Sequence, residues 1–201
     1  MKLRTEAKVQ DKKVVILVAP RESAKTNDWS IQAIRIMYEV MQKLWAVRKD
    51  IVLQIVGGGP TLKNPPPNVS YLKFVRDLNA FLNLADLAIV PYPEWLVCGG
   101  ARNKVLEFFA SRLPVVSTTS GVFGIPEAEP FKNYIPTTYS PEDITNKILL
   151  ALEMKEENLR RIKDNALQLI LTKYTWEKSS RLLSKTLVSL SPQIIKRTET
   201  E

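Results

Sequence analysis

Two continuous apolar runs constrain most strongly what this chain can fold into. Residues 13–19 (KVVILVA) and 51–56 (IVLQIV) are rich in β-branched side chains, and each contains a single polar residue. Such runs are typical of strands buried on both faces of a parallel sheet, because a strand with one face in water alternates apolar and polar residues. The sequence therefore predicts a parallel sheet with helices covering both of its faces.

Helical patterns separate the strand-like runs along the chain. Between the first two runs, apolar residues recur every three or four positions from residue 31 to residue 45, and Asp28 occupies a favourable N-cap position. The further strand-like segments are 69–72, 86–90, 114–117 and 133–137, and the further helical segments are 77–84, 99–110, 141–154, 156–171 and 176–190, followed by frayed residues 196–201. Alternating strands and helices predict an α/β fold with a doubly wound, Rossmann-like parallel sheet of five or six strands. We expect a single domain over residues 1–201, with its core at about 12–190.

Composition limits the chemistry that such a sheet can support. The 201 residues include no histidine, so the commonest general base and metal ligand is missing, and the one cysteine, Cys98, excludes a disulfide framework. The net charge of +8 comes from Lys and Arg residues spread along the chain, which favours solvated surface over a nucleic-acid site. No apolar run is long enough to span a membrane, and the N-terminal residues do not read as a signal peptide. The expected location is the cytoplasm, with peripheral contact to a membrane left open.

The loops that follow the strands carry the candidate ligands, because ligands of doubly wound sheets bind beyond the carboxyl ends of the strands. The first such loop contains two cations, Arg21 and Lys25. The second begins with three glycines, Gly57, Gly58 and Gly59, where the backbone can approach a ligand closely. Taken singly, the cations are typical of surface and the glycines of a turn, and neither the G-x-G-x-x-G nor the P-loop pattern is present.

A glycine-rich segment after the fourth strand predicts an anion site. The segment is Gly99-Gly100-Ala101-Arg102-Asn103-Lys104, and we expect its two glycines to open a helix with free N–H groups and a positive dipole end. One turn inside that helix, Glu107 is a carboxylate suited to a ribose diol. Together with the two cations of the first loop, these groups predict a nucleoside diphosphate site.

Several sequence blocks follow one another in the order of a known family. Residues 104–116 (KVLEFFASRLPVV) are similar to its pattern Lys-x-Leu-Glu-x-Met-Ala-x-Gly-x-Pro-Val-Val, and residues 85–91 (ADLAIVP) match its Ala-Asp block before a proline. Further similar blocks are 55–59 (IVGGG), 69–77 (VSYLKFVRD) and 173–177 (KYTWE). Over about residues 12–190, the chain resembles the C-terminal, nucleotide-sugar-binding domain of GT-B fold, family 4-like glycosyltransferases.

This resemblance implies a retaining, metal-independent glycosyltransferase that uses a nucleoside diphosphate sugar as donor substrate and needs no cofactor. Arg21 and Lys25 would be the catalytic residues, stabilising the charge on the leaving diphosphate. Glu107 would bind the ribose hydroxyls, and the acceptor would be a saccharide or a lipid. The donor-binding residues that the resemblance implies are Gly57, Gly58, Gly59, Lys73, Phe74, Val75, Gly99, Gly100, Arg102, Asn103, Lys104 and Glu107.

The chain also departs from the family pattern. Gly99 stands where the family has the first glutamate of its E-x7-E motif, a residue that helps to hold the donor sugar, and Thr26 replaces a glycine. Family members are roughly twice as long, because an N-terminal half holds the acceptor. Their terminal helix crosses to that half, so we expect an acceptor-domain partner protein or self-association. The apolar residues available for such contacts are Leu182, Leu183, Leu187 and Leu190.

Two alternative functions stay open at this point. One is a stand-alone module that binds a nucleotide sugar without catalysis. The other is a nucleotide-sugar epimerase of the same two-domain fold, which would need acidic and histidine catalysts, whereas the chain has no histidine.

Overall fold

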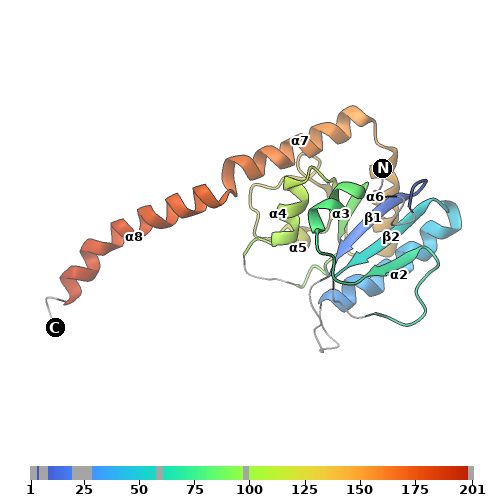
Figure 1. The fold of residues 1–201 in the computed structure, drawn as a ribbon, viewed down its shortest axis with the longest axis horizontal. Coiled ribbons are helices and arrows are strands. Elements are labelled where there is room, and N and C mark those ends of the chain that lie inside the picture. The colour runs from blue at the N-terminus through green and yellow to red at the C-terminus, as the bar shows by residue number, and fades with distance from the viewer. Residues whose placement is uncertain (1–3, 5–8, 20–28, 58–60, 97–99, 199–201) are drawn as a thin grey trace.

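Strands and helices alternate along the chain as the sequence predicts (Figure 1). The computed structural model describes residues 4, 9–19, 29–57, 61–96 and 100–198, and for residues 29 and 191–198 it describes the backbone alone. In chain order the elements are β1 (Lys13–Val18), α2 (Trp29–Val47), β2 (Ile51–Val56), β3 (Val69–Leu72), α3 (Leu78–Leu84), β4 (Leu87–Val90), α4 (Asn103–Ala110), β5 (Val115–Ser117), α5 (Thr119–Val122), β6 (Ile135–Pro136), α6 (Pro141–Glu153), α7 (Glu156–Lys173) and α8 (Trp176–Thr198).

The six strands form one parallel sheet in the order β3-β2-β1-β4-β5-β6. This confirms the doubly wound, Rossmann-like sheet that the apolar runs predict. The chain moves outward from β1 through β2 to β3, and then outward in the opposite direction from β4 to β6. The order therefore reverses between β1 and β4, and the crevice at their carboxyl ends is the position where such folds bind ligands.

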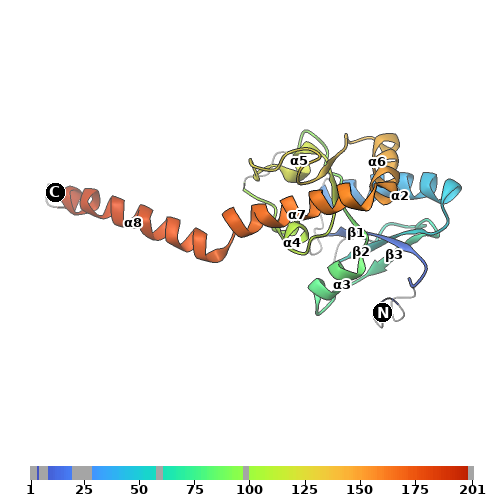
Figure 2. The same cartoon turned by 90° about the horizontal axis from the view of Figure 1, so that it is seen from above.

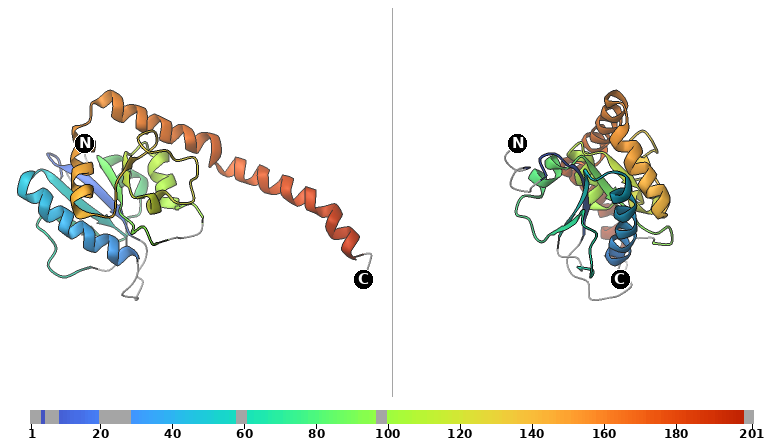
Figure 3. Two further views of the ribbon diagram at one scale, coloured as in Figure 1. Left: turned by 180° about the vertical axis from the view of Figure 1, so that it is seen from behind. Right: turned by 90° about the vertical axis from the view of Figure 1, so that its right-hand side faces the viewer.

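Helices cover both faces of this sheet (Figures 2 and 3). α2 and α6 pack against each other on one face, and α3 lies on the opposite face. The strands between them are apolar because both faces are covered: residues 14–17 of β1 are at most 2% exposed. α8 extends away from the sheet and its covering helices.

Asp86 links β4 to β1 at the amino-terminal edge of the sheet. Its Oδ2 atom accepts hydrogen bonds from Arg4 Nη2 at 2.6 Å and from the Val14 backbone N–H at 2.9 Å, and Lys13 Nζ lies 3.5 Å from Oδ1. The aspartate in the Ala-Asp block before β4 thus links β1 to β4 far from the carboxyl ends of the strands. In this chain that block has a structural role.

Two expectations about helix ends are wrong. α4 begins at Asn103 rather than at the two glycines, because Gly100 has a φ of +77°, which no residue of a right-handed helix adopts. The terminal helix continues to Thr198, beyond residue 190 and into the segment that was expected to fray. The proposed N-cap Asp28 lies outside the described residues.

α4 ends in a Schellman motif with an arginine in the left-handed position. The Leu113 N–H donates to the Phe108 carbonyl and the Arg112 N–H donates to the Phe109 carbonyl, the two bonds that define this motif. Arg112 has a φ of +53°, where glycine is preferred, and its guanidinium pairs with Asp164 of α7. This is the position where the family pattern has glycine.

We expect Arg112→Gly to be about 1 kcal/mol more stable than Arg112→Ala, because only the alanine variant retains the left-handed strain. Arg160 is the matched control, since it also faces Asp164 but lies inside α7. There the order should reverse, with Arg160→Gly less stable than Arg160→Ala by about 1 kcal/mol. Urea unfolding of the four variants measures both differences, and the same order at both positions would contradict the motif.

Candidate functional site

Lys104 connects the first turn of α4 to the sheet at the point where the strand order reverses. Its Nζ atom donates to the carbonyl of Val18, the last residue of β1, at 2.5 Å and to the Tyr92 hydroxyl at 2.9 Å. Tyr92 is fully buried directly after β4. Residues far apart in the sequence therefore meet at the carboxyl ends of β1 and β4, and the ammonium group of Lys104 already has protein acceptors there.

Arg102 stands at the N-cap of α4 and leaves one of its donors without a partner. Its guanidinium carbon lies 4.1 Å from the centre of the Tyr92 ring, and its Nε donates to the Ser120 carbonyl at 3.2 Å. Among the described residues, which leave out 20–28 and 97–99, the buried Nη2 atom has no hydrogen-bond partner and no side chain caps the start of the helix. A buried, unsatisfied cationic donor beside an uncapped helix N-terminus is an environment that favours an anion.

Sequence reasoning missed Tyr92, whose ring lies within cation–π distance of both Arg102 and Lys104. The sequence feature that could have indicated Tyr92 is an aromatic residue between Pro91 and Pro93, just after a central strand. The ring fixes the position of both cations, so Tyr92 belongs to the framework of the site.

The described glycines allow segments of the chain to pack closely. Gly57 has a φ of +117°, and a Cβ atom added there would lie 2.1 Å from the Ala19 carbonyl oxygen. Glycine is therefore required at residue 57 because the ends of β1 and β2 meet there. The sequence suggested another reason, a close approach of the backbone to a ligand. A Cβ added at Gly124 would lie 2.2 Å from the Gly100 carbonyl oxygen, so the loop after α5 packs onto the segment that leads into α4.

Glu107 lies on the outer side of α4, where two cavities adjoin it. One cavity of about 310 Å³ also contacts Leu78 and Asn79 at the start of α3, and another of about 460 Å³ contacts Tyr174 and Trp176. Glu107 is an exposed residue, but protein atoms around its carboxyl group displace part of the surrounding water. This partial burial raises the pKa of the carboxyl above its usual range, whereas the positive charge of nearby Lys104 lowers it. Glu107 therefore faces the helix that follows the loop after β3.

The loop after β3 carries three of the expected donor-binding residues, Lys73, Phe74 and Val75. Lys73 and Phe74 are exposed, with Phe74 80% accessible, whereas Val75 packs partly against the core. The Lys73 carbonyl accepts a hydrogen bond from the Gly57 N–H at 3.1 Å, so the ends of β2 and β3 are joined. An exposed aromatic ring at the carboxyl edge offers a flat surface for a base.

Several of the expected site residues lie outside the described part of the chain: Arg21, Lys25, Gly58, Gly59 and Gly99. The last described residue before Arg21 is Ala19, which follows the Val18 whose carbonyl Lys104 contacts. That Arg21 and Lys25 share one crevice with Glu107 stays a prediction.

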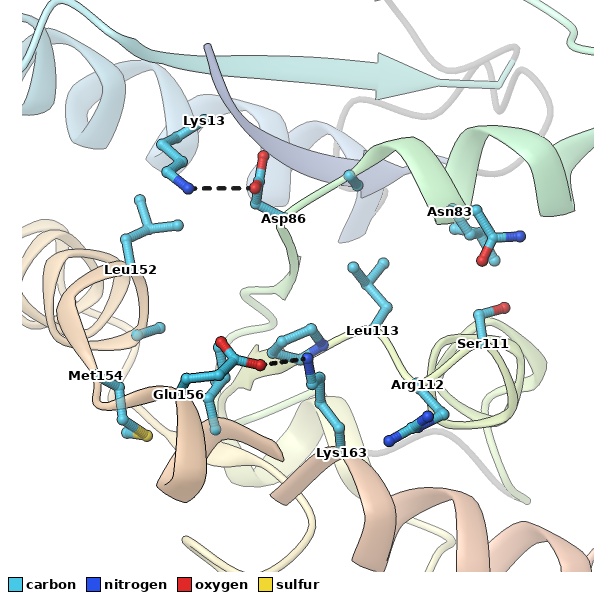
Figure 4. Close-up of a pocket in the computed structure, with 15 residues that line it drawn as sticks. Lys13, Asn83, Asp86, Ser111, Arg112, Leu113, Leu152, Met154, Glu156 and Lys163 are labelled. Atoms are coloured by element: carbon cyan, nitrogen blue, oxygen red, sulfur yellow. Dashed lines mark ion pairs between the residues drawn. The ribbon is translucent and has the colours of Figure 1, made fainter. Parts of the chain in front are cut away.

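A separate cavity of about 300 Å³ opens at the amino-terminal edge of the sheet (Figure 4). Its cations face acids: Lys13 lies 3.5 Å from Asp86, and Lys163 lies 3.6 Å from Glu156. This edge is opposite the carboxyl ends of the strands, where ligands of such folds bind. We therefore interpret the cavity as a space left where α6 and α7 pack against the amino-terminal edge of the sheet.

Neither a metal cluster nor a membrane-spanning segment is found in the described part of the chain. Among those residues, no group of three or more histidine, cysteine, aspartate or glutamate side chains is placed to hold a metal ion. No helix there combines the length and the apolar character needed to cross a bilayer.

Solved structures share this fold over half or more of their length. The Anabaena Alr3699/HepE structure in complex with UDP-glucose is 19% identical with a TM-score of 0.75, and the match covers 94% of this chain and 52% of that one. A glycosyltransferase from Rickettsia africae ESF-5 is 14% identical with a TM-score of 0.73, covering 92% of this chain and 50% of that one. The C-terminal domain of the Francisella tularensis group 1 glycosyl transferase LpcC is 15% identical with a TM-score of 0.66, covering 87% of this chain and 92% of that domain.

These matches identify the fold as that of the C-terminal domain of GT-B glycosyltransferases, and the chain spans about half the length of the Anabaena structure. No curated protein matches the chain. The family profile of the glycosyl transferases group 1 matches residues 12–154, which is well over half of the chain. The chain therefore belongs to the glycosyl transferases group 1 family.

Proposed function

We propose that this chain binds a nucleoside diphosphate sugar in the crevice between β1 and β4 and presents the sugar for transfer to an acceptor. The observation that carries the proposal is the buried Nη2 atom of Arg102 at the start of α4, for which the described part of the chain supplies no hydrogen-bond partner and no side-chain cap. A diphosphate oxygen supplies the acceptor that this donor lacks. The Anabaena protein with the same fold has been crystallised with UDP and with UDP-glucose, which makes a UDP-sugar the first candidate donor.

The remaining residues suit the parts of such a donor. Arg102 and the first N–H groups of α4 would hold the diphosphate, together with Arg21 and Lys25 from the neighbouring loop. Glu107 would accept hydrogen bonds from the ribose hydroxyls, and the exposed ring of Phe74 would stack on the base. Lys104 would act indirectly, by holding the end of β1 against α4 through the Val18 carbonyl.

The proposed reaction is family 4-like transfer with retention of the anomeric configuration. The bond from the anomeric carbon to the diphosphate oxygen breaks with its electrons leaving on the diphosphate. The acceptor hydroxyl oxygen forms the new bond on the same face of the sugar, and its proton passes to the leaving diphosphate. Cations stabilise the charge that develops on the leaving group, which is where electrostatic catalysis acts most strongly. Arg21 and Lys25 are the proposed catalytic cations, in a reaction without a metal ion.

Substituting a cation of the site should weaken donor binding. Losing one charge-assisted hydrogen bond costs about 1.5 to 3 kcal/mol, so Arg102→Gln and Lys25→Ala should each weaken binding of the donor roughly ten- to a hundred-fold. Saturation-transfer NMR with UDP-, GDP- and ADP-sugars selects the donor, and calorimetric titration then measures the affinities.

Arg112→Gln is the matched control, because this arginine lies at the opposite edge of the sheet and should leave the affinity unchanged. If none of the nucleotide sugars binds, the proposed function is wrong. Equal affinities of the native chain and Arg102→Gln would instead remove Arg102 from the site.

A further inference from the structure

A hydrogen bond links the junction of α7 and α8 to the segment that follows α5. The hydroxyl of Tyr174, the C-cap residue of α7, donates to a carboxylate oxygen of Glu127 at 2.6 Å, across 47 positions of the sequence. Burial and the bond itself raise the pKa of Tyr174 to about 12, so the hydroxyl keeps its proton at neutral pH. The same bond lowers the pKa of Glu127, whose carboxyl is therefore charged. The contact is thus a charge-assisted hydrogen bond, which is stronger than a neutral one.

Two consecutive turns connect Glu127 to α5. The Ile125 N–H donates to the Val122 carbonyl at 3.1 Å, and the Ala128 N–H donates to the Ile125 carbonyl at 2.9 Å. Ile125 is only 2% exposed and belongs to the main core, so packing as well as hydrogen bonds fixes the segment. Because closely packed segments transmit displacements, holding Glu127 in place also holds the residues that precede it.

The same segment sets the position of Arg102. A Cβ atom added at Gly124 would lie 2.2 Å from the Gly100 carbonyl oxygen and 2.7 Å from the Ala101 nitrogen, so the two backbones are in direct contact. The Arg102 Nε atom donates to the carbonyl of Ser120, a residue of α5, at 3.2 Å. Both the backbone that leads into Arg102 and its side chain therefore rest on the segment that Tyr174 holds.

We propose that the bond between Tyr174 and Glu127 positions Arg102 for the diphosphate, so that the junction of α7 and α8 controls the affinity for the donor. This inference rests on the proposed function. The groups of a binding site must be held within about 0.5 Å of their productive geometry, and Arg102 would lose that precision if the segment after α5 shifted. Tyr174 and Glu127 are positioning residues, since neither needs to touch the donor.

Tyr174→Phe removes only the hydroxyl and tests the proposal in the complete 201-residue chain. Calorimetric titration with UDP should show about five-fold weaker binding, which is within the range for residues coupled through a shared segment of backbone. Binding of uridine, measured by NMR titration, should change less than about two-fold, because uridine has no phosphate for Arg102 to bind. If the donor screen selects GDP or ADP, that nucleotide and its nucleoside take the place of UDP and uridine.

Two further variants show whether the effect passes through the bond and through Arg102. In the Arg102→Gln background, Tyr174→Phe should weaken UDP binding less than about two-fold, because the group that it positions is gone. Glu127→Gln keeps an acceptor for the Tyr174 hydroxyl, whereas Glu127→Ala does not. Both variants lose the negative charge, so Glu127→Gln should bind UDP about three-fold more tightly than Glu127→Ala through the acceptor alone.

Asp164→Asn is the matched control for a general loosening of α7. Asp164 pairs with Arg112, which lines the cavity at the amino-terminal edge of the sheet, away from the carboxyl ends of the strands. This variant also weakens a contact that holds α7 to the domain, yet it should bind UDP like the native chain.

Several results would overturn the proposal. Native affinity of Tyr174→Phe for UDP would do so, and so would an equal loss for uridine, which would place the effect on the nucleoside. An equal loss in the Arg102→Gln background would show that the bond acts on another part of the site, and an equal loss in Asp164→Asn would reduce it to the stability of α7. If the native chain binds none of UDP, GDP and ADP, the proposed function fails and the positioning role fails with it. If the chain binds one of them and Tyr174→Phe binds it equally well, only the positioning role fails.

Discussion

Gly57→Ala is expected to destabilise the fold by about 3 kcal/mol or more. Residues other than glycine rarely adopt a φ of +117°, and holding one there costs about 1 to 3 kcal/mol. The new Cβ atom would also lie 2.1 Å from the Ala19 carbonyl oxygen, a backbone atom that has no rotamer to change, and such overpacking adds about 1 to 3 kcal/mol. A domain of ordinary stability, about 5 to 15 kcal/mol, would lose a large part of it.

Gly100→Ala separates the two contributions. Gly100 has a φ of +77°, but a Cβ atom added there would meet nothing within 4 Å. This variant should therefore show only the backbone strain, about 1 to 2 kcal/mol. Urea unfolding of both variants gives the comparison, and equal losses would show that the contact between the ends of β1 and β2 is not as tight as described.

The architecture could be predicted because it follows from patterns that are local in sequence. The run at residues 13–19 is apolar throughout because β1 occupies the centre of the sheet and both of its faces are covered, and the pattern at residues 31–45 is helical because one side of α2 faces β2. The start of α4 was misplaced for a physical reason. Two adjacent glycines indicate a helix N-terminus or a turn equally well, and only the φ of Gly100 decides between them.

The candidate site was predictable at the level of loops and not of atoms. The topological rule correctly located the carboxyl ends of the strands as the place where Lys104 and Arg102 gather. It could not show that Lys104 is bonded to Val18, or that Arg102 keeps a nitrogen without a partner among the described residues, because both facts depend on contacts with Tyr92 and Ser120 across the fold. A sequence shows which residues follow a strand. Only the folded structure shows which of their hydrogen-bond donors already have an acceptor within the protein.

The prediction with the largest effect concerns turnover by this chain alone. Holding two reactants in the correct geometry is equivalent to effective concentrations of about 10⁵ to 10⁸ M. In the proposed function the cationic groups of this chain hold the donor, and we assign none of its residues to the acceptor. We therefore expect the 201-residue chain to bind its donor and to transfer the sugar at least about 10⁵-fold more slowly than a typical enzyme.

Donor binding and transfer must be measured on the same sample for this expectation to be tested. Calorimetry first establishes the fraction of chains that bind the nucleotide sugar, and release of the nucleoside diphosphate is then followed with saccharide and lipid acceptors. Slow release at full donor occupancy is the expected result, and an added acceptor-half protein should raise the rate. An ordinary enzymatic rate from the chain alone would show that this domain also positions the acceptor. Absence of donor binding would instead count against the proposed function, because the crevice between β1 and β4 would then lack its ligand.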